Sequence, residues 1–208
     1  MTTLYLIRHS EQLRENGVNN IEDNSQIINE KIILSVEGEE KAKKISEIEE
    51  LNNIDILWSS SYVRAKATAK YIAYKNNIDI NIDSRLNERK LGNLDELKKL
   101  GNIYKHTFAE EQLLDSRLKN IDGENRLEVN KRMTNCINEI ILNNENKKIS
   151  IVSHGAAMRF YLMNYCTLNE DIKLVYKDKI LDFSSPSIIK LTFDKLDLVN
   201  IENVQFND

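Results

Sequence analysis

The chain contains little of what builds disulfide-stabilised, fibrous or membrane proteins. Its 208 residues include 2 Cys, 1 Pro and 6 Gly, which excludes a disulfide scaffold and a collagen-like or low-complexity chain. It has no apolar run near the roughly 18 residues that a transmembrane helix requires, and its mean hydropathy is -0.49. Histidine is also scarce, with 3 residues. What is present, 41% apolar and 30% charged residues, predicts a soluble globular protein.

The charge balance indicates which partners to expect. A formal net charge of -4 and a pI near 5.6 argue against nucleic acid or a membrane surface, but they do not exclude a local cationic pocket. The opening MTTLYLIRHS has no cationic leader and no small-residue cleavage site, so we expect a cytoplasmic protein. Cys136 and Cys166 have no C-x-x-C spacing, and we expect both thiols to be reduced and buried. The sequence leaves a homodimer open.

Short β-rich apolar runs alternate with longer amphipathic stretches, a pattern typical of a sheet covered by helices. The pattern predicts strands at 3–7, 54–59, 78–82 and 149–153, helices at 36–51 and 62–74, a helix from Ala156, and a closing hairpin of 187–193 and 198–204. Ser35 is the expected N-cap of the first helix. We therefore predict the α/β class: a three-layer α/β/α sandwich with a mostly parallel central sheet and antiparallel edge strands.

No repeat, linker or boundary divides the chain, so residues 1–208 are expected to form a single domain. Between about 93 and 146 the pattern is helical, with breaks at Gly101 and at 121–123. This stretch predicts two or three helices without an intervening strand. We expect it to form a lid-like segment.

Chemically distinctive side chains follow three of the predicted strands. Arg8-His9 follows the first strand, Ser59-Ser60-Ser61 and then Arg64 follow the second, and His154-Gly155 follows the last. The carboxyl ends of parallel strands meet at one edge of a sheet, where ligands of α/β proteins bind. Two histidines and two arginines gathered there would suit an anion. A phosphoryl group is the leading candidate, because guanidinium groups and the N–H groups of the helix after Gly155 match its oxygens.

Several segments resemble, in order, the motifs of the histidine phosphatase superfamily, also called phosphoglycerate mutase-like proteins. LYLIRHSE resembles its Arg-His-Gly-Glu signature, and WSSSYVRAKATA resembles its S-S-P-x-x-R-A-x-x-T-A element. LSVEGEEKA, RLNERKLG, DGENRLEVNKR and IVSHGAAMR are similar to four further motifs, the last containing the second histidine. The resemblance covers nearly the whole chain and implies the same three-layer fold.

The resemblance also implies roles for individual residues. His9 would be the nucleophile that forms a phosphohistidine, and Arg8, Arg64 and His154 would hold the phosphoryl oxygens. Glu88 would give a proton to the leaving oxygen and then activate water. Together with Ser10, Gly155 and Asn16 as phosphate-binding residues, this implies a phosphatase that hydrolyses a small phosphomonoester without a metal or another cofactor.

The chain departs from the family pattern at five places. Ser10 stands where Gly is usual, Gln12 where Thr or Ser is common, and Ser61 where Pro is common. Glu15 holds the position of a usual Asn, so either Asn16 substitutes through a longer loop or that contact is lost. The loop after Gly92 lacks the second Gly of a frequent ending.

Two other functions remain as alternatives. One is phosphoryl transfer of the phosphoglycerate mutase type, although those relatives usually have longer chains. The other is a catalytically weak phosphate-binding regulatory module, suggested by Ser10 and Glu15 and opposed by the retained His9, Arg64, Glu88 and His154.

Some polar residues lie outside these assignments. We favour a surface position for His106 over a place at the mouth of the site. Glu124 and Arg126 could form a network near the pocket, but we favour solvated side chains at a helix start. Neither H-x-x-x-H nor H-E-x-x-H occurs, which disfavours His9 and His154 as metal ligands.

Overall fold

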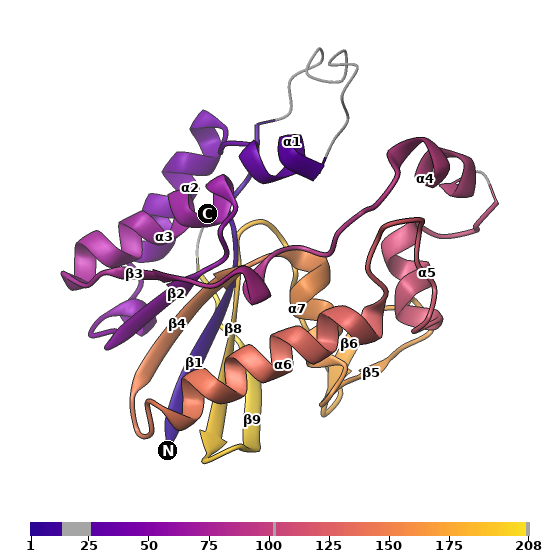
Figure 1. Cartoon of the computed structure of the whole chain (residues 1–208). Coiled ribbons are helices and arrows are strands. Elements are labelled where there is room, and N and C mark those ends of the chain that lie inside the picture. Colours follow the sequence, from indigo (N-terminus) through magenta and orange to yellow (C-terminus); the bar gives the residue numbers. More distant parts are fainter. Residues whose placement is uncertain (14–25, 102, 207–208) are drawn as a thin grey trace.

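The computed structural model describes residues 1–13, 26–101 and 103–206 (Figure 1). Its strands are β1 (Thr2–Arg8), β2 (Ile56–Ser59), β3 (Ile80–Ile82), β4 (Lys148–Ser153), β5 (Thr167–Leu168), β6 (Leu174–Tyr176), β7 (Lys179–Ile180), β8 (Ser187–Asp194) and β9 (Asp197–Asn203). Its α-helices are α1 (Gln26–Lys31), α2 (Val36–Ser46), α3 (Val63–Asn76), α4 (Leu94–Gly101), α5 (Phe108–Leu114), α6 (Arg126–Leu142) and α7 (Gly155–Leu162). Short 3-10 helices cover Glu49–Leu51 and Ser84–Leu86.

The main sheet has six strands in the order β3-β2-β4-β1-β8-β9. β3, β2, β4 and β1 are mutually parallel, and the closing hairpin adds β8 and β9 antiparallel to them. This order places β2, β4 and β1 side by side, with their carboxyl ends at one edge. The predicted mostly parallel sheet with antiparallel edge strands is confirmed.

Both faces of the sheet are covered, which makes the three layers visible in Figure 1. Successive residues of a strand point to opposite faces, so Leu4 and Leu6 of β1 join one core while Tyr5 and Ile7 join the other. The first core includes side chains of α6 and α7, and the second includes side chains of α2 and α3. Burial on both faces explains why the central strands are short, continuous apolar runs.

The predicted helix over residues 36–51 is wrong in its second half. Ser35 caps α2 as predicted, with its hydroxyl accepting the Gly38 N–H at 2.9 Å. The α-helix ends at Ser46, and the chain enters a 3-10 helix at Glu49–Leu51. Ile45 and Leu51 are both fully buried in one core, and six residues at 100° each would put them on different faces of one continuous helix.

Other boundaries differ less. β2 and β3 begin two residues later than predicted, and the small antiparallel sheet β5-β6-β7 was not predicted. The described part of 93–146 contains α4, α5 and α6 and no strand, as predicted, while its lid role stays a prediction. Cys136 and Cys166 are free, buried thiols, and burial raises their pKa to about 12 and about 11. In the described part of the chain, no helix is both long and apolar enough to span a membrane.

Candidate active site

The predicted site residues that the structure describes lie together at the carboxyl edge of β1, β2 and β4. Arg8 ends β1, and His9 follows it. Ser60 follows β2, and His154 follows β4 as the residue before α7. The rings of His9 and His154 have their centroids 5.0 Å apart. Adjacent parallel strands thus bring together side chains that are far apart in the sequence.

The His9 ring is held in one orientation and in its neutral form. Its Nδ1 lies 2.7 Å from the carbonyl oxygen of Ser10, and because a carbonyl only accepts, Nδ1 carries the proton. The opposite nitrogen, Nε2, accepts a hydrogen bond from Arg64 Nε at 3.1 Å. Burial, and then the charge of Arg64, lower the pKa of His9 to about 3. Nε2 therefore keeps its lone pair at neutral pH.

Arg64 is a buried cation fixed from three sides. It comes from the first turn of α3, stacks on the ring of Tyr62 at 4.9 Å, and donates from Nη1 to the carbonyl of Asn29 at 2.5 Å. Arg8 reaches the same region from the end of β1 and donates to the carbonyl of Phe183. Burial lowers the pKa of His154 most, and the charges of His9, Arg64 and Arg8 lower it further. The net charge of -4 thus conceals a local cluster of cations.

Gly155 makes room for Arg8. A Cβ on Gly155 would lie 3.1 Å from Nε of Arg8, tighter than side chains normally pack. The absence of a side chain therefore lets the guanidinium pass directly beside the start of α7.

His154 is fully buried and is held through one nitrogen. The hydroxyl of Ser60 lies 2.7 Å from Nε2, and the same hydroxyl donates to Oδ1 of Asn87 at 3.0 Å. Tyr62 packs its ring edge-on against the imidazole, with centroids 4.7 Å apart. Nδ1 of His154 is buried and has no hydrogen-bond partner among the described residues.

Glu88 caps the N-terminus of α7. Its carboxylate accepts the backbone N–H groups of Ala156 at 3.2 Å and Ala157 at 2.9 Å, and also that of Arg89 at 2.9 Å. A helix N-terminus favours an anion because its first N–H groups have no partner within the helix. Glu88 therefore occupies the donors that were predicted to face a phosphoryl group after Gly155.

Arg132 of α6 braces the loop that carries Glu88. Its guanidinium donates to the carbonyls of Arg85 at 2.7 Å, Asn87 at 2.8 Å and Glu88 at 3.2 Å. It also pairs with both carboxylate oxygens of Glu124 at 2.9 Å. The favoured interpretation of Glu124 as a solvated side chain is therefore wrong, because Glu124 is mostly buried and paired with Arg132. Its alternative, a network of Glu124 with Arg126, is not seen either, since Arg126 Nε bonds to the carbonyl of Gln112.

Ser10 occupies the place of the usual glycine without strain. It is not among the described residues with positive φ, so its Cβ meets no conformational penalty. Its N–H donates to Thr68 Oγ1 at 3.0 Å, while its buried hydroxyl has no partner among the described residues. The Ser10 carbonyl oxygen accepts a hydrogen bond from Nδ1 of His9. A contact of Ser10 with phosphate stays a prediction.

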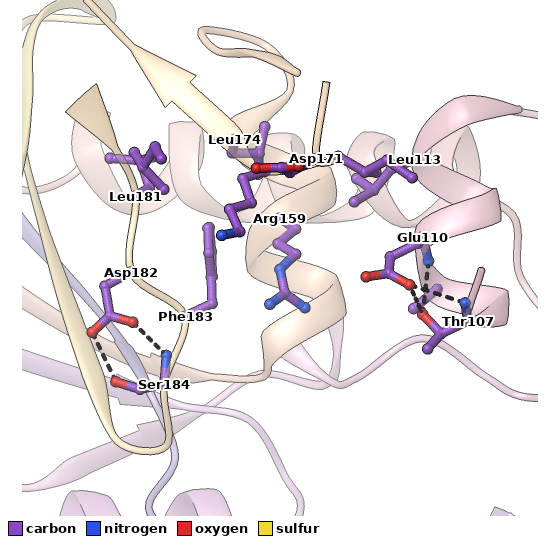
Figure 2. Close-up of a pocket in the computed structure, with 14 residues that line it drawn as sticks. Thr107, Glu110, Leu113, Arg159, Asp171, Leu174, Leu181, Asp182, Phe183 and Ser184 are labelled. Carbon is purple, nitrogen blue, oxygen red and sulfur yellow. Dashed lines mark hydrogen bonds between the residues drawn. The ribbon is translucent and has the colours of Figure 1, made fainter. Parts of the chain in front are cut away.

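Other residues fall outside this cluster. Asn16 lies outside the described residues. His106 is half-buried just before α5. It lines neither of the two pockets beside the His9 cluster nor the pocket between α5 and α7 (Figure 2). Sequence reasoning missed Asn87 and Arg132 as partners of site residues, although Arg132 is the last residue of the motif-like segment DGENRLEVNKR.

Two pockets open onto the cluster. One of about 660 Å³ is lined by Arg8, His9 and Gln12, and one of about 250 Å³ is lined by Tyr62, Glu88 and other polar residues. Within the described residues, no three His, Cys, Asp or Glu side chains are grouped as metal ligands.

The family model of the histidine phosphatase superfamily (branch 1) matches residues 4–203, so the chain belongs to this family. A relative, the probable phosphoglycerate mutase GpmB of Salmonella arizonae, is 30% identical over 166 residues, which cover 76% of this chain and 72% of the relative.

Solved structures share the fold. A mycobacterial glucosyl-3-phosphoglycerate phosphatase in complex with VO3 superposes with a TM-score of 0.70 at 16% identity, covering 99% of this chain and 98% of the other. A phosphoserine phosphatase of Entamoeba histolytica in complex with 3-phosphoglyceric acid has a TM-score of 0.64 at 22% identity, covering 100% of this chain and 98% of the other.

Proposed function

We propose that this protein is a phosphatase that hydrolyses a small phosphomonoester through a phosphohistidine on His9. One observation carries the proposal. The Nδ1–H of His9 is bound to the Ser10 carbonyl, and Nε2 is kept unprotonated beside the guanidinium of Arg64. A neutral, oriented imidazole next to a fixed cation is what nucleophilic attack on a phosphoryl group requires.

The proposed reaction has two steps. In the first, Nε2 of His9 bonds to phosphorus, the ester bond breaks, and Glu88 gives its proton to the leaving oxygen. In the second, Glu88 takes a proton from water, the water oxygen bonds to phosphorus, and the bond to Nε2 breaks to release inorganic phosphate. Because Glu88 accepts three backbone N–H groups as a carboxylate, it must first take up a proton from solvent for the first step, and the second step restores that proton.

Arg8, Arg64 and His154 are proposed to hold the phosphoryl oxygens through both steps. The guanidinium groups supply fixed positive charge where negative charge is redistributed. The buried Nδ1 of His154 lacks a partner among the described residues, and after taking up a proton it would donate a hydrogen bond to a ligand oxygen. No step in this scheme uses a metal.

Family membership indicates phosphatase or mutase activity, and the mutase remains the second candidate. The relative from Salmonella arizonae is named a probable phosphoglycerate mutase, whereas the two structural neighbours described above are named phosphatases. In a mutase the phosphoryl group would pass from His9 to an acceptor hydroxyl instead of water. A regulatory module without activity is disfavoured by the complete set of His9, Arg64, Glu88 and His154.

The test is phosphate release from p-nitrophenyl phosphate in excess chelator, with the phosphoenzyme trapped by rapid quenching. We expect turnover, and an acid-labile, alkali-stable phosphoprotein in the wild type that is absent from His9→Ala. His106→Ala is the matched control, because His106 lines none of the pockets described. Equal turnover by wild type and His9→Ala would show that His9 is not the nucleophile. Turnover that is lost in chelator would indicate a metal-dependent reaction. Transfer of the phosphoryl group to a phosphoglycerate in preference to water would indicate a mutase.

A further inference from the structure

The hydroxyl of Ser60 joins His154 to Asn87, a residue to which the proposed reaction gives no role. Ser60 follows β2, and Asn87 follows the 3-10 helix Ser84–Leu86. Ser60 and His154 are both fully buried, so their polar atoms must find partners within the protein or on a ligand. The hydrogen bonds among these side chains determine which nitrogen of His154 carries a proton.

The amide of Asn87 is oriented by Ser61. The backbone N–H of Ser61 donates to Oδ1 of Asn87 at 2.9 Å, and the Ser61 hydroxyl donates to the same oxygen at 3.0 Å. A backbone N–H can only donate, so the atom of Asn87 that it meets is the carbonyl oxygen and not the amide nitrogen. Proline, the residue common at this position in the family, has no N–H and could not orient Asn87 in this way.

The Ser60 hydroxyl then has one satisfactory arrangement. Its oxygen lies 3.0 Å from Oδ1 of Asn87, which only accepts, so the hydroxyl hydrogen points to Asn87. The oxygen accepts the backbone N–H of Tyr62 at 3.1 Å. Its remaining lone pair faces Nε2 of His154 at 2.7 Å, and Nε2 is therefore the donor. If the hydrogen pointed to His154 instead, two acceptor oxygens would face each other without a hydrogen between them.

His154 thus carries its proton on Nε2 and has only a lone pair on Nδ1. Nδ1 is buried and has no partner among the described residues. This tautomer is the opposite of that of His9, whose proton lies on Nδ1. A lone pair on Nδ1 would repel the oxygens of a phosphate dianion, so the dianion can contact this nitrogen only with an additional proton.

The free protein disfavours a second proton on His154. The titratable and charged groups around the ring are His9 and Arg8 at the end of β1, Tyr62 and Arg64 at the start of α3, Arg132 of α6, and Glu88 at the N-terminus of α7. Burial lowers the pKa of His154 most, and the neighbouring cations lower it further. A bound dianion offsets those cations, so the proton is taken up together with the ligand.

We propose that Asn87 is a positioning residue that acts on His154 through the Ser60 hydroxyl, so that a phosphate dianion enters the site together with a proton. The proton comes from solvent and binds Nδ1, which then donates to a phosphoryl oxygen. The protonated ring adds its charge to those of Arg8 and Arg64 only while the ligand is present. This inference rests on the proposed function, because it requires a phosphoryl group beside His154.

Nitrogen-15 NMR of the 3 imidazole rings reads the tautomers directly, with His9→Ala and His106→Ala to assign the signals. In the free wild type we expect His154 to be protonated on Nε2, and with inorganic phosphate on both nitrogens. Asn87→Leu keeps a branched side chain but removes the acceptor, so the Ser60 hydroxyl can turn to Nε2 and the proton of His154 should move to Nδ1. Asn87→Asp keeps the acceptor and should keep the wild-type tautomer. A proton on Nδ1 of His154 in the free wild type would overturn the inference.

The affinity for inorganic phosphate, measured by isothermal titration calorimetry, tests the uptake of the proton. From about pH 8 to pH 9 the wild-type Kd should rise about tenfold, whereas that of Asn87→Leu should change by less than about twofold. Glu88→Gln should keep the dependence, which separates His154 from the other group that could bind the proton. Asn143→Leu, at an exposed position after α6, is the control and should behave as the wild type.

An equal pH dependence of Kd in wild type and folded Asn87→Leu would assign Asn87 a structural role and overturn the inference. If Asn87→Leu does not fold, Ser60→Ala, which removes the connecting hydroxyl, decides by the same two measurements. Failure of the proposed function is distinct. The wild type would then release no phosphate from p-nitrophenyl phosphate, whereas the tautomer of His154 is measured without turnover.

Discussion

The cluster around His9 and the pocket around Arg159 differ in how their polar groups are satisfied. In the cluster around His9, the side chains of His9, Arg64 and Glu88 already have hydrogen-bond partners inside the protein. In the pocket between α5 and α7, the guanidinium of Arg159 stacks on the ring of Phe183 and has no hydrogen-bond partner among the described residues. A site whose groups are preorganised by the protein favours rate, because little reorganisation accompanies the reaction. We therefore expect the reaction at the cluster around His9, and the following predictions test this difference.

The largest effect is expected from Glu88→Gln, in the cluster around His9. Gln cannot transfer a proton, so turnover of alkyl phosphates should fall about 10²- to 10⁴-fold. Turnover of p-nitrophenyl phosphate should fall much less, because the p-nitrophenolate group leaves without a proton. Steady-state kinetics on both esters measures this difference.

The exposed Glu50, on the 3-10 helix Glu49–Leu51, provides the control variant Glu50→Gln. If Glu88→Gln lowered turnover equally for alkyl and aryl esters, Glu88 would not be the proton donor.

The next effect is expected from Arg132→Ala, which removes the brace of the Glu88 loop. Three backbone carbonyls and Glu124 would lose their common donor. We expect kcat to fall roughly 10- to 100-fold with little change in KM, because placement of Glu88 and not substrate binding is disturbed. Arg126→Ala on the same helix is the control. A change in KM alone would contradict a positioning role.

A smaller effect concerns pH and stability. The pKa of His9 is about 3 in the folded protein and about 6.5 in an unfolded chain, so the unfolded state binds the extra proton between these values. The contribution of the neutral His9 ring to the free energy of unfolding is therefore fully present above about pH 6.5 and decreases as the pH falls toward 3. Between pH 7.5 and 5.0 this amounts to about 2 kcal/mol for His9.

Urea unfolding at the two pH values tests this linkage. Wild type should lose about 2 kcal/mol more than His9→Asn, which has no titrating ring. Equal losses in the two proteins would show that His9 is not held neutral. The acid limb of the kcat/KM profile should also lack a titration of His9 near pH 6.5.

The smallest effect is expected from Ser10→Ala. The Ser10 hydroxyl has no partner among the described residues, and the N–H bond to Thr68 does not depend on the side chain. Stability should change by no more than about 0.5 kcal/mol and turnover by no more than about twofold. Ser60→Ala, which removes the hydroxyl beside His154, should cost clearly more. A large loss of turnover in Ser10→Ala would restore Ser10 as a phosphate ligand.

The same two regions show what the sequence could predict. The carboxyl ends of β1, β2 and β4 could be found from short apolar runs followed by Arg8-His9, Ser60 and His154, because residues after parallel strands must share one edge. Arg159 gave no such signal. It is the one charged residue of α7, whose other residues are all buried, and the pocket around it is formed by segments 107–113 and 171–184.

Two further features could not be predicted from the sequence, for physical reasons. The break in the helix over 36–51 depends on which core Ile45 and Leu51 enter, which is decided by tertiary packing. The binding of Glu88 by the N-terminus of α7 joins a loop and a helix that are distant in sequence. Composition and periodicity report local preferences, whereas the helix break and the position of Glu88 both depend on tertiary contacts.

The sheet order also constrains how the protein is made. β1 has two neighbours, β4 and β8, and both come from the last third of the chain. During synthesis from the N-terminus, the strand that carries Arg8 and His9 therefore has no partner until Lys148–Ser153 has emerged. Such long-range pairing is slow to form. The sheet edge that holds Arg8, His9 and His154 can consequently form only after β4 has been synthesised and lies between β1 and β2.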